Sequence, residues 1–145
     1  MRRGHLMADQ RGQAMVEMAL ILPVLLLLVV GMMEFARAWN AKQVLTDAAR
    51  EGARLAVVDD GGTPAEVRAA IEAALDRAGI PGSEADIQFD EDVSAAGKWR
   101  KIGEMQQVYV AVDYRFGFLG PLIRAATGSE TITIRTLVAM RNECC

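Results

Sequence analysis

The chain has 145 residues, of which 52% are hydrophobic, and a formal net charge of −3. This length leaves room for one membrane-spanning helix and one domain of about 100 residues. A mildly acidic chain without a basic cluster lacks the electrostatic footprint of a nucleic-acid-binding protein. We therefore exclude nucleic acid as a partner.

The longest apolar segment is Ala14–Met33, whose 20 residues include Glu17 as the only charge. In a helix it would rise about 30 Å, the thickness of the hydrocarbon core of a bilayer. A cleaved secretory signal has a shorter apolar core and then a small-residue cleavage site, which this segment does not show. We predict a transmembrane helix over residues 13–38, kinked at Pro23.

The two flanks of this helix differ in charge. Residues 1–12 form a basic leader with Arg2, Arg3 and Arg11, whereas the charges that follow Met33 are of both signs. Because the cytoplasmic flank of a spanning helix carries the excess of Lys and Arg, we expect the leader in the cytoplasm. Residues 39–145 would then form a head on the other side of the membrane.

The head is predicted to open with a continuation of the same helix to about Val58. Small apolar residues recur there at the spacing of one helical face, so another element can approach that face closely. They are Ala41, Val44, Leu45, Ala48, Ala49, Gly52, Ala53 and Ala56. On the other face, Arg50, Glu51 and Arg54 form either a solvated surface with pairs across the helix or a binding site.

A second helix is predicted after the stop signal Asp59-Asp60-Gly61-Gly62. Thr63 is a candidate N-cap, Pro64 suits the first helical position, and Glu66 completes a capping box. Its apolar residues recur at helical spacing until Gly79-Ile80-Pro81-Gly82 ends it.

Beyond this point the apolar residues alternate, which predicts strands. A short strand is expected near Ile87 and Phe89, a longer one from Val108 to Phe116, and another within Thr131–Arg141. The apolar connection 117–124 has room for a short helix. About three antiparallel strands against an Ala-rich helix make a two-layer α+β head.

The head lacks the residues of the common active sites. The only histidine, His5, lies in the leader, so no Ser-His-Asp, Cys-His or histidine-rich metal site can form in the head. No phosphate-binding glycine motif is present either. We therefore predict neither an enzyme nor a cofactor.

Two further groups of residues are weak candidates for a site. Asp86, Asp90 and Asp92 could supply oxygen ligands to calcium, as in a calcium-tuned adhesin tip, but the EF-hand order is absent and no metal site is predicted. Cys144 and Cys145 are adjacent and cannot staple the fold. They either link two chains in an oxidising compartment or have no role.

Glu17 carries the most specific chemistry of the sequence. A carboxylate at mid-bilayer costs roughly 2.5–3.5 kcal/mol, so it either snorkels to water at the membrane edge or meets a cation. A cut after Gly12 would create an α-amino group on Gln13, four residues before Glu17. This ammonium and the carboxylate could pair within one chain or between neighbouring chains.

The leader, Gly12, Glu17 and the apolar helix together resemble the class III signal of type IV pilins and pseudopilins. More narrowly, residues 11–58 resemble the TadE-like family. The residues that carry the resemblance are Arg11–Leu20, Leu22-Pro23, Gly31, Glu34–Arg37 and, most distinctively, Ala48-Ala49-Arg50-Glu51-Gly52-Ala53-Arg54. The resemblance implies a pilin-like α+β fold that begins with a long helix.

It also implies a minor pseudopilin or accessory subunit of a tight-adherence (Flp-type) pilus or a related secretion system. Gly12 would precede the cut by a prepilin peptidase, Gln13 would be the new N-terminus where many pilins have Phe, and Glu17 would serve recognition or assembly. Other pilins or pseudopilins and the inner-membrane pilus platform would be the partners. The head would be periplasmic, with the chain in the bacterial inner membrane or a surface pilus.

We further predict that Pro23, Ala49, Gly52 and Ala53 serve assembly and helix packing. The alternative is an uncleaved single-pass envelope protein whose head binds a ligand or scaffolds a secretion machine.

Overall fold

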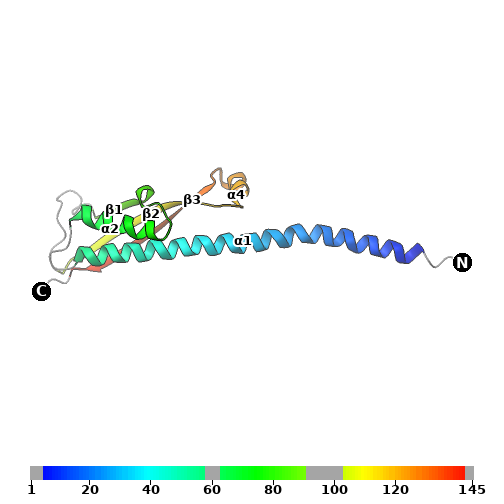
Figure 1. Ribbon diagram of the computed structural model, residues 1–145, viewed down its shortest axis with the longest axis horizontal. Coiled ribbons are helices and arrows are strands. Elements are labelled where there is room, and N and C mark those ends of the chain that lie inside the picture. The colour runs from blue at the N-terminus through cyan, green and yellow to red at the C-terminus, as the bar shows by residue number, and fades with distance from the viewer. Residues whose placement is uncertain (1–4, 58–62, 91–102, 143–145) are drawn as a thin grey trace.

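The computed structural model describes residues 5–57, 63–90 and 103–142, with side chains from residue 12 onward. One long helix, α1 (His5–Val57), runs the length of the molecule, and the rest of the chain folds against its C-terminal half (Figure 1). At about 1.5 Å per residue, its 53 residues span about 80 Å. The free half and the covered half are therefore parts of a single helix.

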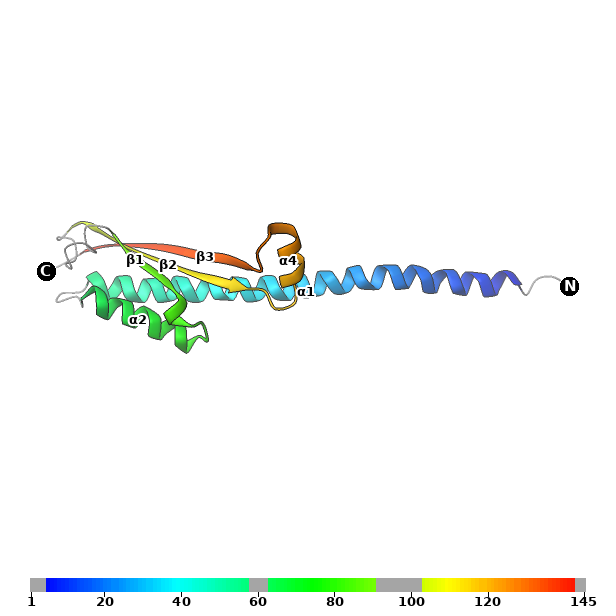
Figure 2. The ribbon, with the colours of Figure 1, turned by 90° about the horizontal axis from the view of Figure 1, so that it is seen from above.

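Helix α1 differs from its prediction at its start and at Pro23. It begins at His5 rather than at Gln13, so part of the expected leader is helical. It also continues through Pro23, and neither Figure 1 nor Figure 2 shows a sharp bend. The helix ends at Val57, and the predicted stop signal lies outside the described residues.

Helix α2 (Pro64–Arg77) begins as the sequence predicts. The hydroxyl of Thr63 accepts a hydrogen bond from the backbone N–H of Glu66, and the Glu66 carboxylate accepts one from the N–H of Thr63 at 2.6 Å. Two of the N–H groups that a helix start leaves without partners are satisfied in this way. The helix then buries Val67, Ile71 and Leu75 against α1.

A short 3-10 turn, η1 (Gly82–Glu84), leads from α2 into the sheet. The sheet has the order β1 (Asp86–Phe89), β2 (Met105–Arg115), β3 (Thr131–Arg141), and all neighbours are antiparallel. Strand β2 pairs with β3 over its whole length, whereas β1 covers only residues 108–111 of β2. Helix α4 (Gly120–Thr127) lies in the connection between β2 and β3.

The core lies between the two helices and one face of the sheet. Figure 2 shows α2 alongside the C-terminal part of α1. Val108 and Val110 of β2 point into it and meet the small residues of α1. The opposite face of the sheet is open, with Gln107, Asp113 and Leu137 exposed. The fold is thus the predicted two-layer α+β arrangement, with three antiparallel strands.

Candidate functional site

The predicted processing segment lies on the free part of α1. The side chains from Gly12 to Val29 are all exposed in the isolated chain. The side-chain amide of Gln13 donates a hydrogen bond to the Glu17 carboxylate, with 3.2 Å between Nε2 and Oε1. The two residues therefore already meet one turn apart, before any cut. Apart from its own helical turn, none of the described residues lies within 4 Å of a Cβ built at Gly12, so the head leaves this position free.

The four residues predicted for assembly and packing fall into two environments. Pro23 is exposed on the free part of α1. Ala49 and Ala53 are fully buried inside the head, and a Cβ at Gly52 would lie 2.5 Å from Cδ1 of Ile71. At Gly52, the close partner of this small-residue stripe is therefore α2 of the same chain.

Of the three acidic candidates, the structure describes Asp86 and Asp90. Asp86 is exposed and accepts a hydrogen bond from Gln88 at 2.8 Å, while Asp92 lies outside the described residues, as do both cysteines. Within residues 5–57, 63–90 and 103–142, no three His, Cys, Asp or Glu side chains are placed to hold a metal ion.

A contact that the sequence reasoning missed is made by Glu34. Its side chain is 2% exposed, although it directly follows the apolar segment. The carboxylate accepts hydrogen bonds from the backbone N–H groups of Gly117 at 3.3 Å and of Phe118 at 3.1 Å. The guanidinium of Arg37, one turn further along the helix, lies 3.6 Å away. Glu34 thus joins the long helix to the connection after β2.

Gly117 permits this contact. A Cβ at Gly117 would lie only 3.2 Å from the Glu34 carboxylate, so a side chain there would crowd the turn. Tyr114 lies beside the same group. Burial, with a smaller contribution from the nearby Glu34 carboxylate, raises the pKa of Tyr114, and Arg37 opposes the shift. The sequence offered one signal for the Glu34 contact: Glu34 directly follows the apolar segment, and Arg37 lies three residues later.

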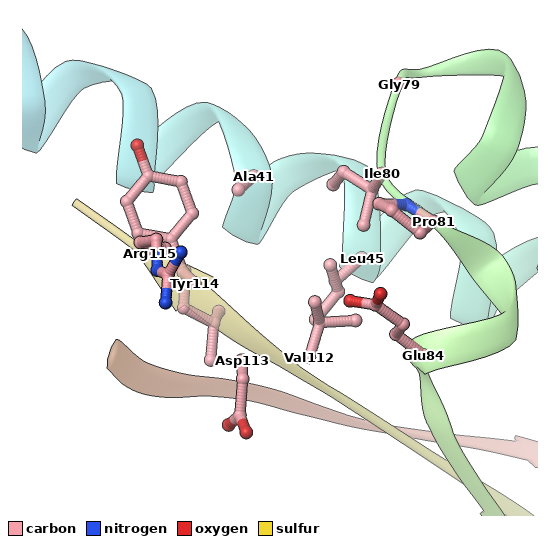
Figure 3. A pocket seen from close by; sticks show the side chains of 11 residues that line it. Ala41, Leu45, Gly79, Ile80, Pro81, Glu84, Val112, Asp113, Tyr114 and Arg115 are labelled. Carbon is pink, nitrogen blue, oxygen red and sulfur yellow. The ribbon is translucent and has the colours of Figure 1, made fainter. Parts of the chain in front are cut away.

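A groove of about 300 Å³ opens further along the head, beside the part of β2 that β1 leaves uncovered (Figure 3). Leu45 of α1 and Ile80, which follows α2, line its apolar side together with Val112. Tyr114 and Arg115 lie at its other end, and Glu84 adds a carboxylate. The groove holds no set of catalytic groups, but it has the shape and apolar lining to receive a side chain.

Together these features define a class of protein: an α+β head on a single helix that is long and apolar enough to cross a membrane. The most apolar window of that helix has a mean hydropathy of 2.6 and is free of contact with the head. The family model described as TadE-like protein matches residues 12–54, which confirms the resemblance over this segment.

The matched segment covers about a third of the chain and ends within α1, so α2 and the sheet lie beyond it. The TadE-like family suggests a protein associated with the Tad pilus, and this family is not known as enzymatic. No curated protein and no solved structure matches the chain.

Proposed function

We propose that the chain is a non-enzymatic minor pseudopilin or accessory subunit in the assembly of a tight-adherence (Flp-type) pilus or a related secretion system. The observation that carries the proposal is Glu17, a carboxylate one turn inside a bare apolar helix and five residues after Gly12. A lone carboxylate in this position is costly in a bilayer, which favours a role that supplies it with a cation.

In this proposal a prepilin peptidase cuts between Gly12 and Gln13. The cut creates an α-ammonium group on Gln13. The side-chain amide of the same residue already reaches the Glu17 carboxylate, with 3.2 Å between Nε2 and Oε1, so the new charge arises one turn from Glu17. Removal of the leader also removes Arg2, Arg3 and Arg11, which hold the N-terminus at the cytoplasmic surface. Cutting thus removes the leader that holds the chain at the membrane surface. It also creates a cation that can pair with the Glu17 carboxylate, and another pilin or the inner-membrane platform can take part in this pair.

Mass spectrometry of the membrane-extracted protein tests the cut. We expect a chain that starts at Gln13 in cells that contain the peptidase and a chain that keeps its leader in cells that lack it. A leader that remains intact in cells with the peptidase as well as in cells without it would contradict the proposal. Gly12→Leu is the matched processing variant, because the open position accepts a side chain without disturbing the fold.

Glu17→Gln tests the charge separately from the helix. It keeps the shape and the apolar length of the segment, so membrane insertion should be normal while pilus assembly is lost. Glu104→Gln is the control, since this carboxylate is exposed on the head and lies outside the segment 48–54. Normal piliation by Glu17→Gln would argue against the charge-pair role.

The groove beside β2 favours one other function, an uncleaved single-pass envelope protein whose head binds an apolar side chain of a partner. Its apolar lining and the uncovered edge of β2 support this alternative. The same mass spectrum separates the two, because the alternative retains residues 1–12.

A further inference from the structure

The connection between β2 and β3 turns at the end of the head that is nearest to the free part of α1 (Figures 1 and 2). Strand β2 runs toward this end and stops at Arg115, α4 follows, and β3 runs back from Thr131. Glu34 holds the connection in place through the N–H groups of Gly117 and Phe118. Since Glu34 directly follows Ala14–Met33, the connection lies level with the end of the apolar segment.

Large apolar side chains are exposed at this level. Phe118 is 72% exposed and Leu122, on α4, is 56% exposed. Phe35 and Trp39 of α1 are also exposed, and their stacked rings are 6.2 Å apart. Each such side chain gains about 1.5–3 kcal/mol on full burial away from water. This end of the head therefore presents a surface that favours an apolar phase.

Basic side chains accompany these apolar ones. Arg37 and Arg124 have side chains that are 55% and 69% exposed, and Arg115 is exposed at the end of β2. Of the carboxylates nearby, Glu34 is buried, and Glu130 pairs with Arg124 at 3.2 Å. Guanidinium groups beside exposed Phe, Trp and Leu fit the boundary of a phospholipid bilayer, where phosphates lie next to acyl chains.

We propose that residues 116–124 of the β2–β3 connection rest in the interface of the phospholipid bilayer that α1 crosses. Phe118 and Leu122 enter the acyl boundary, and the arginines contact lipid phosphates. The head then lies on the membrane surface, held at one level by Glu34, and does not swing freely on the helix. This inference rests on the proposed membrane span of α1.

Lipid quenching of single tryptophans tests the proposal on the full chain. The background carries Trp39→Phe and Trp99→Phe, and the protein is reconstituted into vesicles of phosphatidylethanolamine and phosphatidylglycerol with acyl chains brominated at a shallow or a deep position. Phe118→Trp and, separately, Leu122→Trp report on the connection. Leu137→Trp is the matched control, because Leu137 is 60% exposed on the open face of β3. Leu26→Trp reports on the span.

We expect Trp at 118 and at 122 to show blue-shifted emission and to lose emission with shallow bromines, while Trp at 137 shows neither change. Trp at 26 should be quenched by the deep bromines. If it is quenched while the tryptophans at 118 and 122 behave like that at 137, the interfacial inference is wrong and the span stands. If Trp at 26 is not quenched, the span fails, and the inference fails with it.

Discussion

At the scale of single residues, two carboxylates of α1 have opposite surroundings. Glu17 is exposed on the bare part of the helix, whereas Glu34 is buried where the head begins. Glu34 is satisfied within the chain by two N–H groups and by Arg37. Glu17 has only the amide of Gln13 in the described structure. A buried, fully paired charge serves the fold, so the unpaired one is the group available for a partner.

Glu34→Ala should destabilise the head by about 1–3 kcal/mol, because it removes the acceptor of two backbone hydrogen bonds. Chemical unfolding in detergent, followed by near-UV circular dichroism, measures the loss, and faster amide exchange of Phe118 localises it. Glu51→Ala is the control and should cost less than about 1 kcal/mol, as surface ion pairs do. Equal losses for the two variants would contradict the structural role of Glu34.

The raised pKa of Tyr114 predicts how the free energy of unfolding changes at alkaline pH. Burial and the Glu34 carboxylate raise its pKa in the folded state, while the unfolded chain ionises near the ordinary value of about 10. Below that pH both states keep the phenol neutral, and this group adds no pH dependence. Above it the unfolded state loses the proton first, so the free energy of unfolding falls as the pH rises.

Tyr114→Phe should therefore show a shallower loss of stability above about pH 10 than the parent chain, because the titrating group is gone. Denaturant unfolding at a series of pH values measures it. Glu34→Gln should reduce the same slope, since it removes one cause of the raised pKa. Identical slopes for the parent and Tyr114→Phe would contradict the assignment.

At the scale of elements, the sequence predicted the features that depend on neighbouring residues. It did not predict the contacts between residues that are far apart in the chain. The last strand was predicted within Thr131–Arg141, and β3 occupies this range. The capping box at Thr63 also forms as expected. Both depend on neighbouring residues. The pair of Glu34 and Gly117 is separated by 83 residues. No periodicity in either segment indicates that contact, since it depends on where β2 ends against α1.

The small-residue stripe of α1 shows the same limit. Its spacing predicted a close partner but could not say whether the partner belongs to this chain, and the structure places α2 there. The sequence likewise indicated a short first strand. It did not indicate that β1 covers only residues 108–111 and leaves the edge of β2 open beside the groove, because register depends on both strands.

Gly52→Ala tests the contact of α1 with α2. The new methyl group would lie 2.5 Å from Ile71, which is fully buried, so overpacking should destabilise the head by about 1–3 kcal/mol. Thermal unfolding measures the change. Gly31→Ala is the control, because a Cβ there meets nothing within 4 Å. The double variant Gly52→Ala/Ile71→Ala should lose less than the sum of its single variants, and strict additivity would contradict the contact.

At the scale of the whole molecule, the charges at the two ends of the apolar helix predict its orientation in the membrane. The leader brings Arg2, Arg3 and Arg11, while the head is acidic and its described helices and strands share one hydrophobic core. A compact head outside the cytoplasm and a basic leader inside it agree with the positive-inside rule. The connection at Phe118 would then meet the outer surface of the same membrane.

Cysteine labelling tests this orientation, in a background in which Cys144 and Cys145 are replaced by serine. We expect Leu137→Cys to react with a membrane-impermeant maleimide in intact spheroplasts, because Leu137 is exposed on the open face of the head. Arg3→Cys, tested in cells that lack the prepilin peptidase so that the leader is retained, should react only after lysis, and Leu26→Cys, within the span, should stay unlabelled before and after it. Labelling of position 3 before lysis and of position 137 only after it would reverse the orientation. The head would then be cytoplasmic, and the proposed pilus function would lose its topological basis.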